Sequence, residues 1–182
     1  HDVATDWARP LTFSGATNGV HLAGAGGQWI CGGLTYSSGA AAADFDFGSQ
    51  SPSTATAPLQ INGDFTPNAT VNILVRNGTG WNNSLGTSYP LFTWTGAGPA
   101  DLSAFSTAVQ SGVDGLGGSL SLSGSTISFV VGLKAPDLAY GIAPTVPLVI
   151  TLSDLENAGL QSAQSSPSFS IVSVSPTSTA GG

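Results

Sequence analysis

The two histidines of this sequence could bind copper. His1 would offer its α-amino group and its imidazole, and a second histidine would complete a three-nitrogen copper site of the brace type. His21 is the only other histidine, and it lies in a run, GVHL, that is typical of a strand. Because it follows His1 so closely within such a run, we favour His21 as an ordinary strand residue, and we expect no copper.

Asp44 and Asp46 could hold a calcium ion. They alternate with Phe45 and Phe47, so a strand would place both carboxylates on one face and both rings on the other. Carboxylate oxygens suit Ca²⁺, but the spacing of an EF-hand loop is absent. We favour a half-exposed edge strand with buried phenylalanines, and keep calcium binding as the alternative.

No set of residues predicts catalysis. The ten Asp and Glu residues are scattered, whereas a glycosidase needs two positioned carboxylates. Asp154 and Glu156 are better explained as charges at a helix N-terminus. Both histidines lie in the first 21 residues without a nucleophile-elbow motif, and the glycine-rich run at 23–27 lacks the lysine of a phosphate loop. We predict that the protein is not an enzyme and has no cofactor.

One tryptophan and three asparagines indicate contact with carbohydrate. Trp81 lies in the turn-like run GTGWNN, where an exposed indole could stack on a sugar ring, whereas Trp29 and Trp94 lie in strand-like runs and are expected in the core. Asn68, Asn77 and Asn82 each begin an Asn-x-Ser/Thr sequon. We expect Trp81 to be the ligand-binding residue and the three asparagines to carry glycan if the producing cell glycosylates secreted proteins.

The composition is unusual in its lack of charge. Only 7% of residues are charged, against roughly a quarter in ordinary domains, while 41% are apolar. The net charge of −7 and the three basic residues, Arg9, Arg76 and Lys134, argue against nucleic acid and anionic membrane surfaces as partners. A surface covered by Ser, Thr, Asn, Gln and Gly favours self-association or a glycan coat, because charge is what keeps like surfaces apart.

The sequence also predicts an extracellular location. It begins with His1 and contains no methionine, which we interpret as the product of signal-peptide removal. No apolar run is long enough to cross a bilayer, so we expect no membrane insertion. Cys31 is the single cysteine, which excludes an intrachain disulfide, and its run QWICGGL predicts a buried thiol.

Alternation of apolar and polar residues predicts an all-β fold. Period-two patterns occupy residues 71–76 and 89–94, and two short runs around Ser123-Gly124-Ser125 form a hairpin pattern. We predict about ten strands in an antiparallel β-sandwich or jelly-roll, with a β-solenoid as the alternative. Residues 101–110 have helical spacing, and residues 153–163 begin with a capping box, so one or two short helices are expected. A last strand is expected at 168–175.

The stretch from Leu59 to Val131 resembles the C-terminal unit of autotransporter-associated β-strand proteins, which are secreted or cell-surface proteins of bacteria. The resemblance lies in LQINGDFTPNATVNILV, GTSYPLFTWTG and GLGGSLSLSGSTISFVV. It implies an extracellular location and β architecture. It implies no catalytic residue at these positions.

We divide the chain into an N-terminal arm at 1–13, a β domain at 14–175 and a flexible tail at 176–182. The function expected is that of a structural subunit of an extracellular filament, pilus-like fibre or surface layer, whose copies join by β-strand addition. The alternative is a secreted carbohydrate-binding or adhesive module. The donor strand is expected in the N-terminal arm or in the last strand, with these side chains at the subunit interface: Val3, Trp7, Leu11, Phe13, Phe169 and Ile171.

Overall fold

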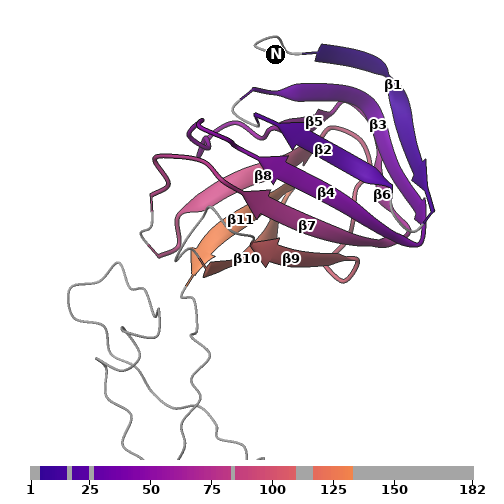
Figure 1. The fold of residues 1–182 in the computed structure, drawn as a ribbon. Helices are drawn as coiled ribbons and strands as arrows, with labels where there is room; N and C mark the ends of the chain where they lie inside the picture. The colour runs from indigo at the N-terminus through magenta and orange to yellow at the C-terminus, as the bar shows by residue number, and fades with distance from the viewer. Residues whose placement is uncertain (1–4, 16–17, 25–26, 83–84, 110–116, 133–182) are drawn as a thin grey trace, which may run out of the picture.

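The computed structural model describes residues 5–15, 18–24, 27–82, 85–109 and 117–132, and all regular structure in these residues is β (Figure 1). None of the described residues forms a helix that could cross a membrane. The strands form one seven-stranded and one four-stranded sheet. They are β1 (Thr5–Ser14), β2 (Gly19–Ala23), β3 (Trp29–Ser38), β4 (Ala40–Asp46), β5 (Leu59–Ile61), β6 (Phe65–Pro67), β7 (Thr70–Arg76), β8 (Ser88–Trp94), β9 (Phe105–Val109), β10 (Gly117–Ser123) and β11 (Thr126–Gly132).

The chain passes back and forth between the two sheets. The seven-stranded sheet has the order β1-β3-β5-β8-β11-β10, with β6 also paired to β3, and the four-stranded sheet has the order β2-β4-β7-β9. From β1 to β9 every pairing is parallel, so each pass adds one layer beside the previous one. Only the hairpin β10–β11 and its pairing with β8 are antiparallel. This hairpin turns at Gly124, at φ 54°, as its sequence predicts.

The all-β prediction is therefore confirmed, but the antiparallel prediction is wrong for most of the fold. Among the described residues, seven of the nine strand pairings are parallel. Alternation with period two reports only that one face of a strand is buried, and it is the same for both strand directions. The direction of a strand depends on the path of the connection that precedes it, and the alternation of apolar and polar residues carries no information about that path.

The helix expected at residues 101–110 is also wrong. Residues 101–104 form a turn, and β9 begins at Phe105. The strand pairs in parallel with β7. The hydrogen bonds available at the edge of β7 therefore outweigh the preference for a helix that the spacing of the apolar residues indicates. The helix expected at 153–163, the strand at 168–175 and the tail at 176–182 lie outside the described residues.

The core lies between the two sheets and is filled mainly by every second side chain of the strands, although in β8 the consecutive residues Leu91 and Phe92 are both buried. In β7, Val71, Ile73 and Val75 are fully buried, whereas Asn72 is exposed, as the alternation predicts. Each such aliphatic side chain contributes about 1.5–3 kcal/mol through its burial. Cys31 is buried as predicted, and burial raises the pKa of its thiol. The largest fully buried side chains are Tyr36, Tyr89, Phe45, Phe47, Phe65, Phe92, Phe129, Leu22, Leu34, Leu59, Ile61 and Ile73.

Two buried tyrosines differ in how their hydroxyls are satisfied, which leads to a prediction. The hydroxyl of Tyr36 has no hydrogen-bond partner among the described residues, and burial raises its pKa far above the usual range. The hydroxyl of Tyr89 accepts a hydrogen bond from the backbone N–H of Asn82 at 2.6 Å. We expect Tyr36→Phe to leave the free energy of unfolding unchanged or higher, because it removes an unsatisfied buried group, whereas Tyr89→Phe should lower it by about 1 kcal/mol.

Urea unfolding of both variants measures this difference, provided that their m-values equal that of the wild type. Equal losses in the two variants would contradict it, since they would mean that the hydroxyl of Tyr36 is satisfied after all.

Candidate functional site

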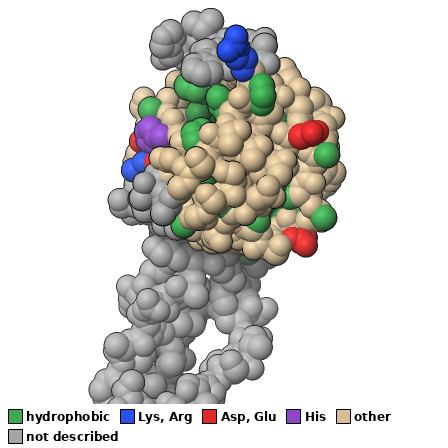
Figure 2. Space-filling model, turned by 90° about the vertical axis from the view of Figure 1, so that its right-hand side faces the viewer, with side chains coloured by type: hydrophobic (Ala, Val, Ile, Leu, Met, Phe, Trp, Pro, Cys, Tyr) green, Lys and Arg blue, Asp and Glu red, His purple; other side chains and the backbone are tan. Residues whose placement is uncertain are grey.

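The end of the fold formed by β1 and β2 leaves part of the apolar core open. A pocket of about 340 Å³ lies there between the two sheets. Leu11 and Phe13 at its rim are only half-buried, and Trp29 is 39% exposed. Figure 2 shows hydrophobic side chains gathered toward this upper part of the molecule. We call this feature the apolar opening, and it is lined by Leu11, Phe13, Gly19, Val20, His21, Trp29, Leu34 and Leu59.

The apolar opening is bounded by the outermost strand of each sheet. β1 is the edge of the seven-stranded sheet, and β2 is the edge of the four-stranded sheet. An edge strand has N–H and C=O groups that point away from the sheet and can pair with another strand. The opposite end differs, because the β10–β11 hairpin extends the larger sheet and brings β10 into contact with β9 (Figure 1). Among the described strands, the open part of the core therefore lies between the edge strands β1 and β2.

Beside the opening, Asp44 is held by two basic side chains. It is 8% exposed and is the one charged residue that is buried in the described part of the chain. The Nδ1 atom of His21 lies 2.7 Å from Asp44 Oδ2, and Arg76 Nε donates to Asp44 Oδ1 at 2.8 Å. A second contact joins Arg76 Nη2 to Asp44 Oδ2, so the guanidinium binds both oxygens, and the pKa of Arg76 is raised by these hydrogen bonds.

The parallel pairing of β2, β4 and β7 explains this cluster. The register places His21 directly opposite Asp44, and Arg76 lies opposite Asp46 on the other side of β4. All of these side chains alternate with buried ones such as Phe45, so they share the outer face of the four-stranded sheet. Figure 2 shows the histidine with basic and acidic side chains beside it at the left of the view. Sequence reasoning missed the cluster because its members lie far apart in the chain.

Asp46 lies on the same face but has other partners. Its Oδ1 accepts hydrogen bonds from the side-chain amide of Asn77 at 2.7 Å and from the backbone N–H of Gly48 at 2.9 Å. The hydrogen bond from Asn77 is the main reason that the pKa of Asp46 lies below its usual range. Asn77 adopts φ 54°, a left-handed conformation that asparagine tolerates.

The placement of Asp44 and Asp46 answers part of the prediction made for them. Their shared face and the burial of Phe45 and Phe47 are confirmed. The edge position is wrong, since β4 lies between β2 and β7. Among the described residues no group of three or more His, Cys, Asp or Glu could hold a metal. The oxygens of Asp44 face Arg76 and His21, so the geometry gives the calcium prediction no support.

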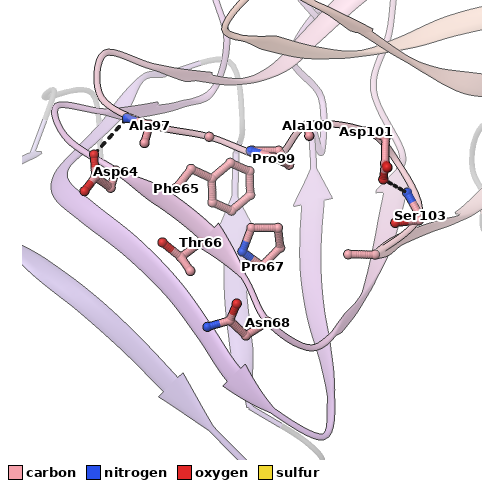
Figure 3. Close-up of a pocket in the computed structure, with 12 residues that line it drawn as sticks. Asp64, Phe65, Thr66, Pro67, Asn68, Ala97, Pro99, Ala100, Asp101 and Ser103 are labelled. Atoms are coloured by element: carbon pink, nitrogen blue, oxygen red, sulfur yellow. Dashed lines mark hydrogen bonds between the residues drawn. The ribbon is translucent and has the colours of Figure 1, made fainter.

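A second pocket of about 330 Å³ lies where the turn before β6 meets the loop after β8 (Figure 3). Figure 3 shows Phe65 in its middle, with Asp64 toward one end and Asp101 toward the other. Asp64 accepts a hydrogen bond from the backbone N–H of Ala97, and Asp101 accepts one from that of Ser103, each at 2.8 Å. The pKa of Asp101 is lowered by its hydrogen bonds from Ser103. We call this pocket the corner groove.

Residues far apart in the sequence form the corner groove. The backbone N–H of Phe65 donates to the carbonyl of Ala97 at 2.8 Å, which joins the two segments. The rest of the lining is polar or small, with proline, and it includes one residue of a predicted sequon, Asn68. No local sequence motif predicts the corner groove, because neither segment forms a site alone. It is lined by Asp64, Phe65, Thr66, Pro67, Asn68, Ala97, Gly98, Pro99, Ala100, Asp101, Ser103 and Ala104.

Trp81 does not lie free in its turn. Its ring is half-buried and packs edge-on against Phe47 and Tyr89, at centroid distances of 5.3 and 4.7 Å. Its Nε1 donates to the carbonyl of Asn77 at 2.9 Å. Ligand binding by Trp81 stays a prediction, but the packing already uses much of its surface. Trp94 is buried at 6% exposure as expected, whereas the prediction of a core position for Trp29 is wrong.

The three sequon asparagines lie in different surroundings. Asn68 and Asn82 are exposed. Asn77 is half-buried, and its amide nitrogen, the atom that would carry glycan, is the donor to Asp46. Glycosylation stays a prediction for all three, and the geometry favours Asn68 and Asn82 over Asn77.

The predicted interface residues are only partly covered by the structure. Leu11 and Phe13 line the apolar opening. Trp7 lies in β1, whose backbone pairs with β3 of the same chain. Residues 1–13 are thus not a separate arm over the part described. His1, Val3, Phe169 and Ile171 lie outside the described residues.

Comparisons with known protein families, curated proteins and solved structures found no match. The resemblance over residues 59–131 therefore stays a prediction.

The contacts of Asp46 predict a pH dependence of stability. The pKa of Asp46 in the folded state lies below the ordinary value of 3.8. Its contribution to the free energy of unfolding is therefore present in full above pH 3.8 and is lost as the pH falls through the folded-state pKa. We expect Asp46→Ala to lower the free energy of unfolding by about 1 kcal/mol at pH 7, and the difference from wild type to shrink at acidic pH.

The matched control is Asn77→Gly, which removes the donor and tolerates the left-handed backbone. Asn77→Gly should reproduce most of the decrease in the free energy of unfolding, and the decrease in the double variant should be smaller than the sum of the two single decreases. A loss for Asp46→Ala that stays constant down to pH 2 would contradict the prediction.

Proposed function

We propose that the protein is a structural subunit of an extracellular filament, fibre or surface layer, and that it joins copies of itself by β-strand addition. The observation that carries this proposal is the apolar opening between two free edge strands. Backbone groups at a free edge can pair with an incoming strand, and apolar side chains beside them can bury its inward residues. The scarcity of charged side chains, 7% of the chain, supports the same conclusion, since few charges would lose their hydration where copies meet.

We infer further that the fold is a short parallel β-solenoid, the alternative raised by the sequence. The strands group into four layers, β1–β2, β3–β4, β5/β6–β7 and β8–β9, each with a strand in both sheets. In such a stack each layer contacts only its neighbours, so the first and last layers need a cover. The β10–β11 hairpin supplies the cover at one end. The end bearing Trp29 and Phe13 has no equivalent among the described strands.

The mechanism differs from the one expected for an N-terminal donor arm. Because β1 pairs along its length with β3 of its own chain, residues 5–13 are poor candidates to be lent to a neighbour. Pairing between copies would instead use the outward backbone groups of edge strands that stay in their own sheets, such as β2. Full burial of a large apolar side chain contributes about 1.5–3 kcal/mol, and covering Trp29, which is 39% exposed, would contribute part of this.

Two exposed apolar residues of similar exposure allow a matched test. Trp29 at the opening is 39% exposed, and Leu85, away from it in the turn before β8, is 40% exposed. We expect wild type to associate with increasing concentration in analytical ultracentrifugation and to form assemblies visible by negative-stain electron microscopy. Trp29→Glu should weaken association at least about tenfold, which corresponds to about 1.4 kcal/mol, because it places a charge in the contact, whereas Leu85→Glu should have no effect.

A wild-type chain that remains monomeric at all accessible concentrations would overturn the proposal. Equal effects of the two substitutions would show that the opening is not where copies meet.

The corner groove favours carbohydrate binding as a second candidate function. Its size and its carboxylate, hydroxyl and amide groups suit one or two sugar rings. We expect Asn68→Ala to weaken any glycan bound there about tenfold on a glycan array, because the exposed amide is lost. Trp81→Phe, which keeps the aromatic packing, should leave that binding unchanged. Loss of binding with Trp81→Phe alone would place the sugar at the indole instead.

A further inference from the structure

The two ends of the strand stack are chemically unlike, which limits how copies can join. The hairpin end presents β10, whose Ser119, Ser121 and Ser123 are exposed. The other end presents the apolar opening. Head-to-tail stacking would press this serine-rich strand against an apolar pocket and leave the pocket's side chains without apolar contacts. The best match for the open end is another open end.

The two free edges at the open end are not equally able to accept a strand. β1 carries Pro10, which has no N–H to donate, and the exposed charge of Arg9. Its register with β3 also shifts twice, between Trp7 and Pro10 and between Phe13 and Ser14. Proline, charge and bulges are the features by which natural sheets protect an edge. β2, in contrast, has neither proline nor an Asp, Glu, Lys or Arg residue.

We infer that two copies meet at their open ends about a two-fold axis, with β2 of one copy pairing antiparallel to β2 of the other. This inference rests on the proposed self-assembly and specifies its first contact. All five residues of β2 overlap only when His21 lies at the axis, which sets Val20 of each copy opposite Leu22 of the other. Both of these side chains point into the core, so the paired strands carry the apolar interior across the contact.

The charges at this end permit the approach of two identical surfaces. Although the chain has a net charge of −7, no carboxylate is among the described residues that line the apolar opening. Asp44 beneath His21 is already paired with Arg76. Trp29 and Phe13 of each copy would then contact the opening of the partner. The hairpin ends remain outside, so this contact alone closes a dimer, and a longer assembly needs a second contact elsewhere on the chain.

Cysteine cross-linking tests this arrangement, since the native thiol of Cys31 is buried. Cα atoms of residues directly opposite in an antiparallel pair lie about 4.5–5.5 Å apart, which is within disulfide range. We expect His21→Cys in the full chain to form a disulfide-linked dimer on mild oxidation, as seen on non-reducing gels. The control in the same strand is Ala23→Cys, which is also exposed but would lie about four residues from its symmetry mate and should not cross-link.

The outcomes separate this inference from the proposed function. If His21→Cys cross-links and Ala23→Cys does not, the two-fold contact at β2 is supported. If the chain associates but His21→Cys does not cross-link, or Ala23→Cys does so instead, the assigned axis is overturned while self-assembly stands. If the chain does not associate at any concentration, both fail. Thermal unfolding of each reduced variant checks that the substitution leaves the fold intact.

Discussion

The structure depends on apolar side chains that stack between two sheets from successive passes of the chain. Ile73 and Phe45 on the four-stranded sheet and Phe92 on the larger one are fully buried, and the ring of Phe45 meets that of Phe92 edge-on at 5.1 Å. Strands such as β7 contribute an inward side chain at every second position, so adjacent strands must stay in register for the core to close. This requirement explains the outward polar face, whereas the parallel direction follows from the way the chain alternates between the two sheets.

The two sheets end at β1 and β2 on one side and at β10 and β9 on the other, and the described strands close these two ends to different extents. The hairpin β10–β11 reverses direction and closes one end with serine and glycine. At the other end the interior remains accessible beside β2. The polar cluster on Asp44 lies on the outer face immediately beside this opening, where it satisfies a buried carboxylate with two basic partners. Residues of β2 such as Val20 and Leu22 thus belong both to the core and to the strand beside the opening.

Carboxylates of the described residues are engaged in hydrogen bonds within the chain. These carboxylates hold turns or neighbouring strands together, as Asp64 and Asp46 do, and none forms a cluster suited to a metal. The corner groove has the composition of a shallow polar binding site, and its carboxylates already accept hydrogen bonds from backbone N–H groups. Association and sugar binding would use different surfaces, so one does not exclude the other.

The sequence by itself determined that the chain forms strands, which residues of β7 and β4 face inward, and where the hairpin at Gly124 turns, because these follow from local alternation and turn chemistry. Tertiary structure decided the rest. Parallel direction, the strand at residues 105–109 and the exposure of Trp29 depend on which neighbour a segment meets, and the same local pattern fits either outcome. The Asp44 cluster and the corner groove each join segments more than twenty residues apart, so only the register between strands brings their side chains together.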